Sequence, residues 1–438
     1  MSGIKNFLKK IFPDNSVVRL TYHKILAVIA AIIWRFPSEN MEVIAVTGTN
    51  GKTTTCNMIA AIMMEAGKKV GMATTVRFRI GDEVWSNRSK QTTLSPFQLQ
   101  KLLRDMVYEH CDVAIIEATS HAMAQSRLWG INVDTAVLTN VDKDHIEYHG
   151  SFEEYRRAKG LLFDNLHKFK RKPHIKKVGI LNRDDKNFEY FNKFFYDRVI
   201  SYGFTAKADS TAANVNFSVN KSTFTLKVPN STLDIILPLS GKFNIENALA
   251  AISTGIAHNI SLNVIQKALA KMETVPGRLE LIDEGQLFNI VVDYAHIPDA
   301  MQKVMEIFKP ITKGSLIVVF GATGGGRDKG KRPEMGHIAE NYCDKIILTN
   351  DDPYTEDQVQ IIEDIANGMK RKEGEDFWKV TDRRQAIKLG LAMAKEEDTV
   401  LVLGKGGEEV IVIGEDKIPW DDRNVIRELL SREVKVEI

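Results

Sequence analysis

The sequence predicts an α/β protein with a central phosphate-loop domain, whose sheet is mostly parallel, and a C-terminal Rossmann-like α/β domain. Three observations support this fold class. A buried strand, a glycine turn and a helix follow one another over residues 41–66. Short β-branched runs alternate with helical patterns before and after a boundary at 275–278, as in parallel sheets. The length of 438 residues calls for two or three domains, which we expect at 1–40 (a short helical segment), 41–274 and 275–438.

The elements of the central domain follow in chain order. Met41–Thr47 is a β-branched run, and the apolar spacing of Lys52–Ala66 is helical. Ser95-Pro-Phe-Gln98 and Ser151-Phe-Glu-Glu154 have the capping-box pattern that opens a helix. Further segments are buried strands at 113–116 and 136–138, antiparallel strands over 214–239, and helices near 245–258 and 262–271.

The C-terminal domain repeats the alternation of strands and helices. Its predicted strands are Phe288–Val292, Leu316–Phe320, Lys345–Leu348 and Thr399–Leu403, and its first helix is Pro298–Phe308. Crossover helices between such strands give a parallel sheet.

Val46-Thr-Gly-Thr-Asn-Gly-Lys-Thr53 predicts a site for a nucleoside triphosphate. Gly48 and Gly51 let backbone N–H groups approach an anion, and the following helix adds its positive N-terminus. Lys52 can reach the terminal phosphates, and Thr53 can place a hydroxyl on Mg²⁺. Val46 stands where the general phosphate-loop pattern has a glycine.

Composition narrows the function classes. A net charge of +2 gives no sign of broad nucleic-acid binding, and the basic run Lys168–Lys172 is interpreted as a solvated face. Cys56, Cys111 and Cys343 lack metal or disulfide spacing, so we expect buried thiols in a reducing cytosol.

The apolar run Ile25–Trp34 is too short to cross a bilayer, which takes ~20 residues. Two alternatives remain for it. It is a helix packed on the first domain, or a helix lying on the inner face of the membrane with Arg19, Lys24 and Arg35 near the headgroups. The second alternative predicts peripheral membrane contact through residues 1–38.

Eight segments in order resemble motifs of the Mur ligases, the ATP-dependent enzymes that join amino acids to carboxylates. They are Thr47–Thr54, Glu117–Ala122, Thr139–Gly150, Ala158-Lys159, Gly241–Asn247, Pro276–Arg278, Asp293–His296 and Gly326–Arg332. The chain is similar to the branch that adds the third amino acid of the peptidoglycan stem. The resemblance implies a cytoplasmic ligase of peptidoglycan precursor synthesis that uses ATP and Mg²⁺, acts through an acyl phosphate, and takes a muramyl-peptide-like acceptor and an amino acid.

The resemblance implies catalytic roles for Lys52, Glu117, His145 and Lys159. It implies metal ligation by Thr53, Glu117, His145 and a carbamylated Lys159, in which an ammonium becomes a carboxylate-like ligand. The residues alone allow plainer interpretations: a strand-end carboxylate, a core or surface histidine, and a lysine on a helix surface.

The remaining site residues are also implied by the resemblance. ATP would contact Gly48, Thr49, Asn50, Gly51, Lys52, Thr53, Thr54, Asn247, Arg278, Asp293 and His296. The acceptor and the amino acid would contact Thr92, Thr93, Ser120, Arg127, Arg327, Lys329, Asp351, Asp352, Tyr354 and Glu408. Capping by Asn244, ion pairs and loop hydrogen bonds are the alternatives for these residues.

Three departures from the family pattern affect substrate choice. Only about 40 residues precede Met41, too few for the uridine-nucleotide-binding domain of the family, so we expect that domain to be truncated and a lipid-linked acceptor is one hypothesis. Asp351-Asp-Pro-Tyr354 stands for D-N-P-R, which favours an amino acid with a cationic side chain such as lysine. Gly404-Lys-Gly-Gly-Glu408 lacks the histidine of G-K-G-H-E.

Two other functions remain open from the sequence. One is a polyglutamate-type or other carboxylate ligase with a non-UDP acceptor. The other is a non-catalytic ATP-binding switch protein, although neither an N-K-x-D nor a D-x-x-G segment stands in the expected context.

Overall fold

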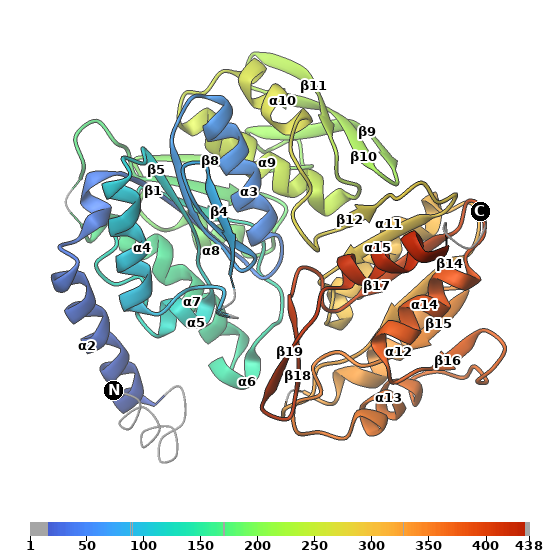
Figure 1. Ribbon diagram of the computed structural model, residues 1–438. Coiled ribbons are helices and arrows are strands. Elements are labelled where there is room, and N and C mark those ends of the chain that lie inside the picture. The colour runs from blue at the N-terminus through green and yellow to red at the C-terminus, as the bar shows by residue number, and fades with distance from the viewer. Residues whose placement is uncertain (1–15, 88, 90, 170, 327, 434–438) are drawn as a thin grey trace. The chain divides into compact units, whose positions relative to one another are not determined.

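The computed structural model describes residues 16–87, 89, 91–169, 171–326 and 328–433. The chain divides into two compact units, which are described separately (Figure 1). Unit 1 comprises Met1–Asn216, Thr223–Leu237 and Phe243–Met272, and unit 2 comprises Phe217–Ser222, Pro238–Lys242 and Glu273–Ile438.

The larger sheet has 11 strands in the order β11-β10-β9-β8-β7-β6-β1-β5-β2-β3-β4. Its strands are β1 (Glu42–Thr47), β2 (Val70–Ala73), β3 (Arg77–Ile80), β4 (Glu83–Ser86), β5 (Val113–Glu117), β6 (Thr135–Leu138), β7 (Val178–Asn182), β8 (Arg198–Gly203), β9 (Ser210–Ser218), β10 (Lys221–Val228) and β11 (Ser231–Leu237). The helical segments of this part are α2 (Val17–Ile33), η1 (Pro37–Asn40), α3 (Lys52–Glu65), α4 (Pro96–Tyr108), α5 (Ser120–Ala124), α6 (Ile146–His149), α7 (Phe152–Asp164), η2 (Asn165–His167), α8 (Phe188–Asn192), α9 (Lys242–Ala257) and α10 (Leu262–Ala270).

Strand β1 lies between β6 and β5 and is parallel to both, with Val46 opposite Glu117 in β5 and Val137 in β6. Strand β2 is parallel to β5 on its other side. The carboxyl ends of β1, β5, β6 and β2 therefore meet at one edge of the sheet, where open α/β sheets hold their ligands. Two-residue connections join β9, β10 and β11, which requires the antiparallel pairing that the alternating sequence predicts.

Successive residues of β1 face opposite sides of the sheet. Val43 and Ala45 belong to a core with Leu99 and Leu103 of α4 and Phe163 of α7. Helix α3 contacts β1, β2 and β5, and its Met58 and Ile59 are fully buried. The three cysteines are free and buried, as predicted.

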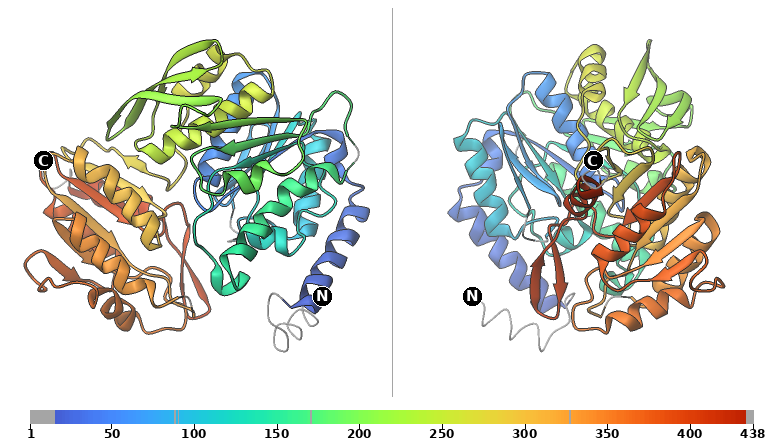
Figure 2. Two further views of the ribbon diagram at one scale, coloured as in Figure 1. Left: turned by 180° about the vertical axis from the view of Figure 1, so that it is seen from behind. Right: turned by 45° about the vertical axis from the view of Figure 1, so that its right-hand side comes forward.

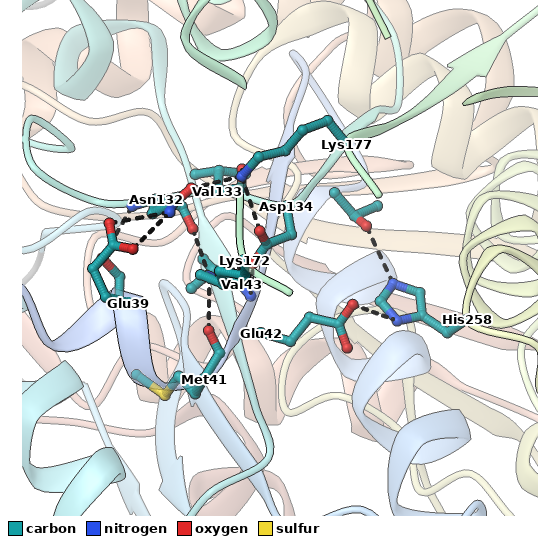
Figure 3. A network of polar contacts seen from close by, with 12 residues as sticks. Glu39, Met41, Glu42, Val43, Asn132, Val133, Asp134, Lys172, Lys177 and His258 are labelled. Carbon is teal, nitrogen blue, oxygen red and sulfur yellow. Dashed lines mark hydrogen bonds and ion pairs between the residues drawn. The ribbon is translucent and has the colours of Figure 1, made fainter. Parts of the chain in front are cut away.

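The amino ends of β1, β6 and β7 are joined by a buried polar network (Figure 3). Asp134 accepts hydrogen bonds from Lys172, from Lys177 at 2.9 Å and from the backbone N–H of Val43 at 2.9 Å. Lys177 also donates to Asn132 Oδ1 and the Val133 carbonyl. The prediction that Lys168–Lys172 is a solvated face is therefore wrong for Lys172, which is 6% exposed.

Helix α2 packs along α4 at the outside of unit 1 (Figures 1 and 2). Ser16 caps it by accepting from the N–H of Arg19. A Cβ built on Gly130 would lie 2.6 Å from the Cβ of Ala31, so small residues set this close approach. The packed helix is one of the two alternatives that the sequence left open.

Two local predictions differ from the structure. Ser95 Oγ donates to Gln98 Oε1 at 2.6 Å, so the two side chains bond to each other and Ser95 makes no side-chain capping bond to a backbone N–H. Asn244 lies inside α9, which starts at Lys242, and is not its cap. Ser151 does cap α7, through the N–H of Glu154.

Unit 2 contains a six-stranded sheet in the order β12-β13-β17-β14-β15-β16 and a separate β18–β19 ribbon. The strands are β12 (Glu280–Ile282), β13 (Asn289–Asp293), β14 (Leu316–Phe320), β15 (Lys345–Leu348), β16 (Phe377–Lys379), β17 (Thr399–Leu403), β18 (Val410–Ile413) and β19 (Asp416–Pro419), and the helices are α11 (Pro298–Ile311), α12 (Lys331–Tyr342), α13 (Gln358–Ala366), α14 (Arg383–Met393) and α15 (Asp422–Glu433). β13 to β16 and β17 are parallel, and only β12 runs antiparallel at the edge. The predicted α/β class with a mostly parallel sheet and a Rossmann-like second sheet is confirmed.

Candidate active site

The phosphate loop starts after β1, and this explains the valine in its motif. Val46 is fully buried inside β1, and the turn begins only at Gly48. Gly51 has φ +82°, the left-handed conformation that glycine adopts without strain. A Cβ on Gly51 would lie 2.1 Å from Asn247 Oδ1, and the same oxygen accepts from Thr55 Oγ1 at 3.3 Å. Asn247 of α9 thus lies directly against the loop and the first turn of α3.

The loop is fixed by the segment that follows β6. Asn140 accepts from the N–H of Thr49 through its carbonyl at 2.8 Å and from the N–H of Asn50 through Oδ1 at 2.9 Å. Thr139 Oγ1 donates to the Asn50 carbonyl at 2.6 Å. Thr49 Oγ1 lies 2.9 Å from the hydroxyl of Tyr155. Together these bonds hold the loop in one conformation.

Lys52 folds back over its own loop. Its Nζ donates to the carbonyls of Gly48 at 3.0 Å and Thr49 at 2.7 Å. This is the position from which an ammonium group at the first residue of α3 contacts the end of a polyphosphate. Thr54 is buried in the same turn.

Glu117 and Thr53 form an oxygen pair beside the loop. Thr53 Oγ1 lies 3.0 Å from each carboxylate oxygen of Glu117. Glu117 Oε2 also accepts from the N–H and the hydroxyl of Thr75, at 2.8 and 3.0 Å. Glu117 is only 2% exposed. Hard oxygens of this kind suit Mg²⁺, which takes few protein ligands and keeps water and phosphate oxygens in its other positions.

His145 lies among aromatic side chains at the other rim of the loop. Its ring centroid is 4.6 Å from that of His121, and its Nε2 is 3.3 Å from Asp144. Burial, followed by the charges of neighbouring histidines, lowers the pKa of His121 to about 3. Burial also lowers the pKa of His145, so its ring is in the neutral form that binds metals. Within the described residues, no three His, Cys, Asp or Glu side chains converge as metal ligands would.

Lys159 is buried at 1% exposure on α7. Its Nζ donates to the Gly48 carbonyl at 2.6 Å and lies 4.5 Å from the Tyr155 ring centroid. Burial, with the charge of Lys52 next, holds its pKa well below the usual lysine value. Lys159 therefore belongs to the site and does not lie on a helix surface.

Polar groups beside the carboxyl end of β5 connect to Arg127. Thr93 Oγ1 donates to the Glu117 carbonyl at 2.9 Å, and the Thr93 carbonyl accepts from Arg127 Nη1 at 2.6 Å. Ser120 Oγ lies 3.0 Å from His149 Nε2. Arg127 also donates hydrogen bonds from Nε and Nη2 to Gln125 Oε1. Thr92 is half-buried beside Thr93.

In unit 2 the motif loops gather at the carboxyl ends of β13 and β17. Asp293 accepts from the N–H groups of Leu279 and Ala295, each at 2.8 Å. A Cβ on Gly277 would lie 1.8 Å from the Gly407 nitrogen, so the two glycine loops touch through their backbones. Arg278 lies over the Tyr294 ring at 4.4 Å.

His296 ends the same motif, and its Nδ1 lies 2.7 Å from the Tyr294 carbonyl. Burial, and then the charge of Lys331, lowers the pKa of His296 to about 4. Lys331 Nζ donates to the His296 carbonyl at 3.2 Å.

A second group in unit 2 gathers carboxylates around a buried ammonium. Lys405 is fully buried and lies 2.9 Å from Asp352 Oδ1, 3.9 Å from Asp351 Oδ1 and within hydrogen-bond distance of Glu408. Asp351 Oδ2 is buried without a hydrogen-bond partner in the structure. Three carboxylates thus surround one ammonium. Tyr354, at φ +52°, is joined to the β18–β19 ribbon through Val412 and Gly414.

Of the predicted residues in the loop before α12, Lys329 lies 3.3 Å from Glu356 and is largely exposed. Arg327 lies outside the described residues.

Comparison with known proteins identifies the family. Residues 46–255 match the Mur ligase middle domain, and residues 277–406 match the Mur ligase glutamate ligase domain. The chain is 40% identical over 405 residues to a UDP-N-acetylmuramoyl-L-alanyl-D-glutamate–2,6-diaminopimelate ligase of Bacillus velezensis, which covers 91% of this chain and 80% of the relative. The chain belongs to the Mur ligase family. It is therefore an ATP-dependent ligase that joins an amino acid to a carboxylate.

Other relatives of this Mur ligase give a consistent result. A UDP-N-acetylmuramyl-tripeptide synthetase of Roseiflexus is 39% identical over 93% of this chain and 82% of its own length. A solved UDP-N-acetylmuramoyl-L-alanyl-D-glutamate–2,6-diaminopimelate ligase has a TM-score of 0.64 and 32% identity over 90% of this chain and 79% of that structure. The MurF ligase of Thermotoga maritima in complex with ADP, at 17% identity and TM-score 0.68, covers 94% of this chain and 85% of its own and shares the fold.

Sequence reasoning missed several residues that hold this site together. Thr75, Asn140 and Tyr155 contact Glu117 or the phosphate loop although none belongs to the residues named beforehand. The signal for Asn140 was available, because it directly follows the strand that neighbours β1. Thr75 could be found only by knowing that β2 lies beside β5.

Proposed function

We propose that this Mur ligase extends a muramyl-peptide-like acceptor by one amino acid in peptidoglycan precursor synthesis. The observation that carries the proposal is the buried Thr53–Glu117 pair beside a phosphate loop with Lys52 at its head. The similarity to muramyl-peptide ligases at 39–40% identity supports the acceptor class. It favours this acceptor over a polyglutamate-type substrate, and family membership does not support a non-catalytic switch.

The reaction follows from the chemistry of the groups. A carboxylate is a poor acyl donor, so one acceptor oxygen attacks the γ-phosphorus of ATP, the bond to the β-phosphate oxygen breaks, and ADP leaves. The amino group of the incoming amino acid then attacks the acyl phosphate, loses a proton, and inorganic phosphate leaves the tetrahedral intermediate. Lys52 and the loop residues Gly48–Thr54 are proposed to hold the phosphates.

Thr53 and Glu117 fit Mg²⁺, and His145 and Lys159 are proposed to contribute to a further metal position. Mg²⁺ when bound would neutralise the negative charge of phosphate and carboxylate. A buried lysine with a lowered pKa is partly neutral, and a neutral amine can add CO₂ to give a carbamate and a proton. This supports carbamylation of Lys159.

We place the adenine side at Asn247 because that side chain touches Gly51 and Thr55. Arg278, Asp293 and His296 are proposed for the nucleotide side of unit 2. Thr92, Thr93, Ser120 and Arg127 are proposed for the acceptor, whose anionic group would replace Gln125 on the Arg127 fork.

The incoming amino acid is proposed to carry a cationic side chain. Asp351, Asp352 and Glu408 place three carboxylates around Lys405, and Oδ2 of Asp351 accepts no hydrogen bond from the described residues. Tyr354 offers no positive charge for a second carboxylate of the substrate. Lys329 and Arg327 are proposed to meet the anionic groups of substrate or nucleotide.

The test measures phosphate release with a panel of amino acids against UDP-linked and lipid-linked muramyl dipeptides, with products identified by mass spectrometry. We expect turnover that requires both an acceptor and an amino acid, fastest with lysine-like substrates. Asp351→Asn should raise the KM for the cationic amino acid, whereas Asp416→Asn on the exposed β19 should not. A preference for diaminopimelate would contradict only the proposal that the incoming amino acid has a cationic side chain. The absence of turnover with every combination of acceptor and amino acid would contradict the proposed ligase reaction.

A further inference from the structure

Helix α2 exposes a stripe of large aliphatic side chains. Val18, Ile25, Ile29 and Ile32 are 46%, 52%, 39% and 60% exposed. At 100° per residue these positions lie within one narrow arc of the helix, and Ile33, at 57% exposure, extends it. The opposite face is made of small residues, because Ala27, Ala30 and Ala31 are completely buried against unit 1.

The usual arrangement of a surface helix is therefore inverted. An amphipathic helix of a globular protein turns its large apolar side chains toward the core and its polar side chains toward water. In α2 the alanines satisfy the packing on α4 and the loop at Gly130. The isoleucines keep between about 39% and 60% of their surface exposed on the opposite face.

Basic residues predominate in the segment that carries the stripe. Met1–Arg35 contains six of the 59 Lys and Arg side chains and one of the 57 Asp and Glu side chains, so the rest of the chain is net negative. No acidic residue lies between Ser16 and Arg35. Lys24 lies within α2 and Arg35 lies two residues beyond its end, and both are exposed.

We propose that α2 is an interfacial helix that docks the protein on a bilayer containing anionic lipids. The isoleucine stripe would enter the boundary between headgroups and acyl chains, while Lys24 and Arg35 contact anionic headgroups. Among the described residues, no helix is sufficiently long and apolar to span a bilayer.

A second copy of the chain fits the stripe less well. One face of a 17-residue helix, about 25 Å long and 10 Å wide, offers roughly 250 Å², well below the ~800 Å² per partner of a stable interface. Two copies would also bring together two segments of the same positive charge. An anionic bilayer offers the opposite charge and an acyl-chain interior into which the isoleucine side chains can insert.

The test is co-sedimentation of the full chain with vesicles of phosphatidylcholine alone or mixed with phosphatidylglycerol at low and high salt. The key variant is Ile25→Ser, Ile29→Ser and Ile32→Ser together, whose side chains are exposed and do not pack in the core. Its matched control is Ile236→Ser, Leu287→Ser and Val359→Ser, three aliphatic side chains that are 52%, 73% and 56% exposed elsewhere.

We expect the wild type to bind the anionic vesicles, and the α2 variant to lose at least about tenfold in partition coefficient while the control variant binds like the wild type. Lys24→Glu with Arg35→Glu should weaken binding to anionic vesicles only. Failure of the wild type to bind at low salt, equal binding by the α2 variant, or a dimer that the α2 variant abolishes would overturn the proposal. None of these outcomes depends on ligase turnover, so the proposed reaction is judged separately.

Discussion

Thr53 Oγ1 lies 3.0 Å from both carboxylate oxygens of Glu117, and Thr75 holds one of those oxygens from the other side through its N–H and its hydroxyl. The carboxylate is thus oriented before any ion binds. Thr75 is a positioning residue, because it acts on the ion only through Glu117.

We predict that Thr75→Val weakens the response to Mg²⁺ by about 10–100-fold, the usual effect of losing a hydrogen bond behind a metal ligand. The measurement is the Mg²⁺ concentration that gives half-maximal ATP turnover. Thr75→Ser keeps the hydroxyl and should restore the wild-type value. A Val variant with unchanged Mg²⁺ dependence would show that Thr75 does not position Glu117.

Gly51→Ala should abolish nucleotide binding, because its Cβ would collide with Asn247 Oδ1. Gly67→Ala is a matched control: its φ is +81° against +82° for Gly51, and no atom lies within 4 Å of the added Cβ. Both variants carry the left-handed penalty of roughly 1–2 kcal/mol. Binding of a fluorescent ATP analogue should distinguish them, and equal losses in the two would mean that the contact with Asn247 is unimportant.

Lys159→Ala should lose about 10²-fold or more in turnover, as expected when a preorganised electrostatic group is removed. If the lysine acts as a carbamate, added short carboxylic acids should restore part of the activity. Arg157→Ala, which alters an exposed side chain on the same helix, should leave turnover unchanged. Full activity of Lys159→Ala would remove this residue from the mechanism, and a loss without rescue would argue against the carbamate.

Asp134→Ala should lower the free energy of unfolding by about 3–5 kcal/mol, because it leaves Lys172 and Lys177 buried without their carboxylate. Asp105→Ala breaks the exposed pair with Lys101 and should cost under ~1 kcal/mol. Urea unfolding of both variants gives the comparison. Similar small losses would mean that backbone carbonyls alone satisfy the two lysines.

His296 should make the protein less stable in mild acid. Its pKa is about 4 in the folded chain and about 6.5 when unfolded. Between these values the unfolded state binds more protons, so stability falls as the pH is lowered from about 6.5 to about 4. The slope is at most about 1.4 kcal/mol per pH unit, and less because the residue is only partly buried. His296→Gln should flatten the profile of unfolding free energy against pH, and His337→Gln on the exposed side of α12 should not.

The sequence was informative where structure is local. The strand, turn and helix around Gly48–Thr53 were predictable because glycine spacing and apolar periodicity act over a few residues. Glu117 could be placed at a ligand-binding edge because it ends a buried run. The hydrogen-bond donors to that carboxylate could not be predicted. Thr75 lies beside Glu117 only because β2 is the neighbour of β5 in the sheet, and the sequence does not give this strand order.

The buried position of Lys172 also could not be predicted from neighbouring residues in the sequence. In the sequence it ends a basic run, and only the fold brings Asp134 and the Met41 carbonyl to it. For α2, the periodicity of the sequence shows a face of alanines and a face of large aliphatic residues. It does not show which of the two packs on the rest of unit 1, because the packing of the alanines depends on the partner surface at Gly130.

The buried Asp134 network clamps β1, β6 and β7 at the ends opposite to the phosphate loop. These strands are consequently held at their amino ends, while the candidate site lies at their carboxyl ends. Substitutions in the loops at the carboxyl ends of the strands can therefore change substrate recognition without disturbing the buried network. The departures at Asp351–Tyr354 are an example in the other sheet. Engineering for new acceptors should therefore keep the Asp134 network and vary the loops at the carboxyl ends of the strands.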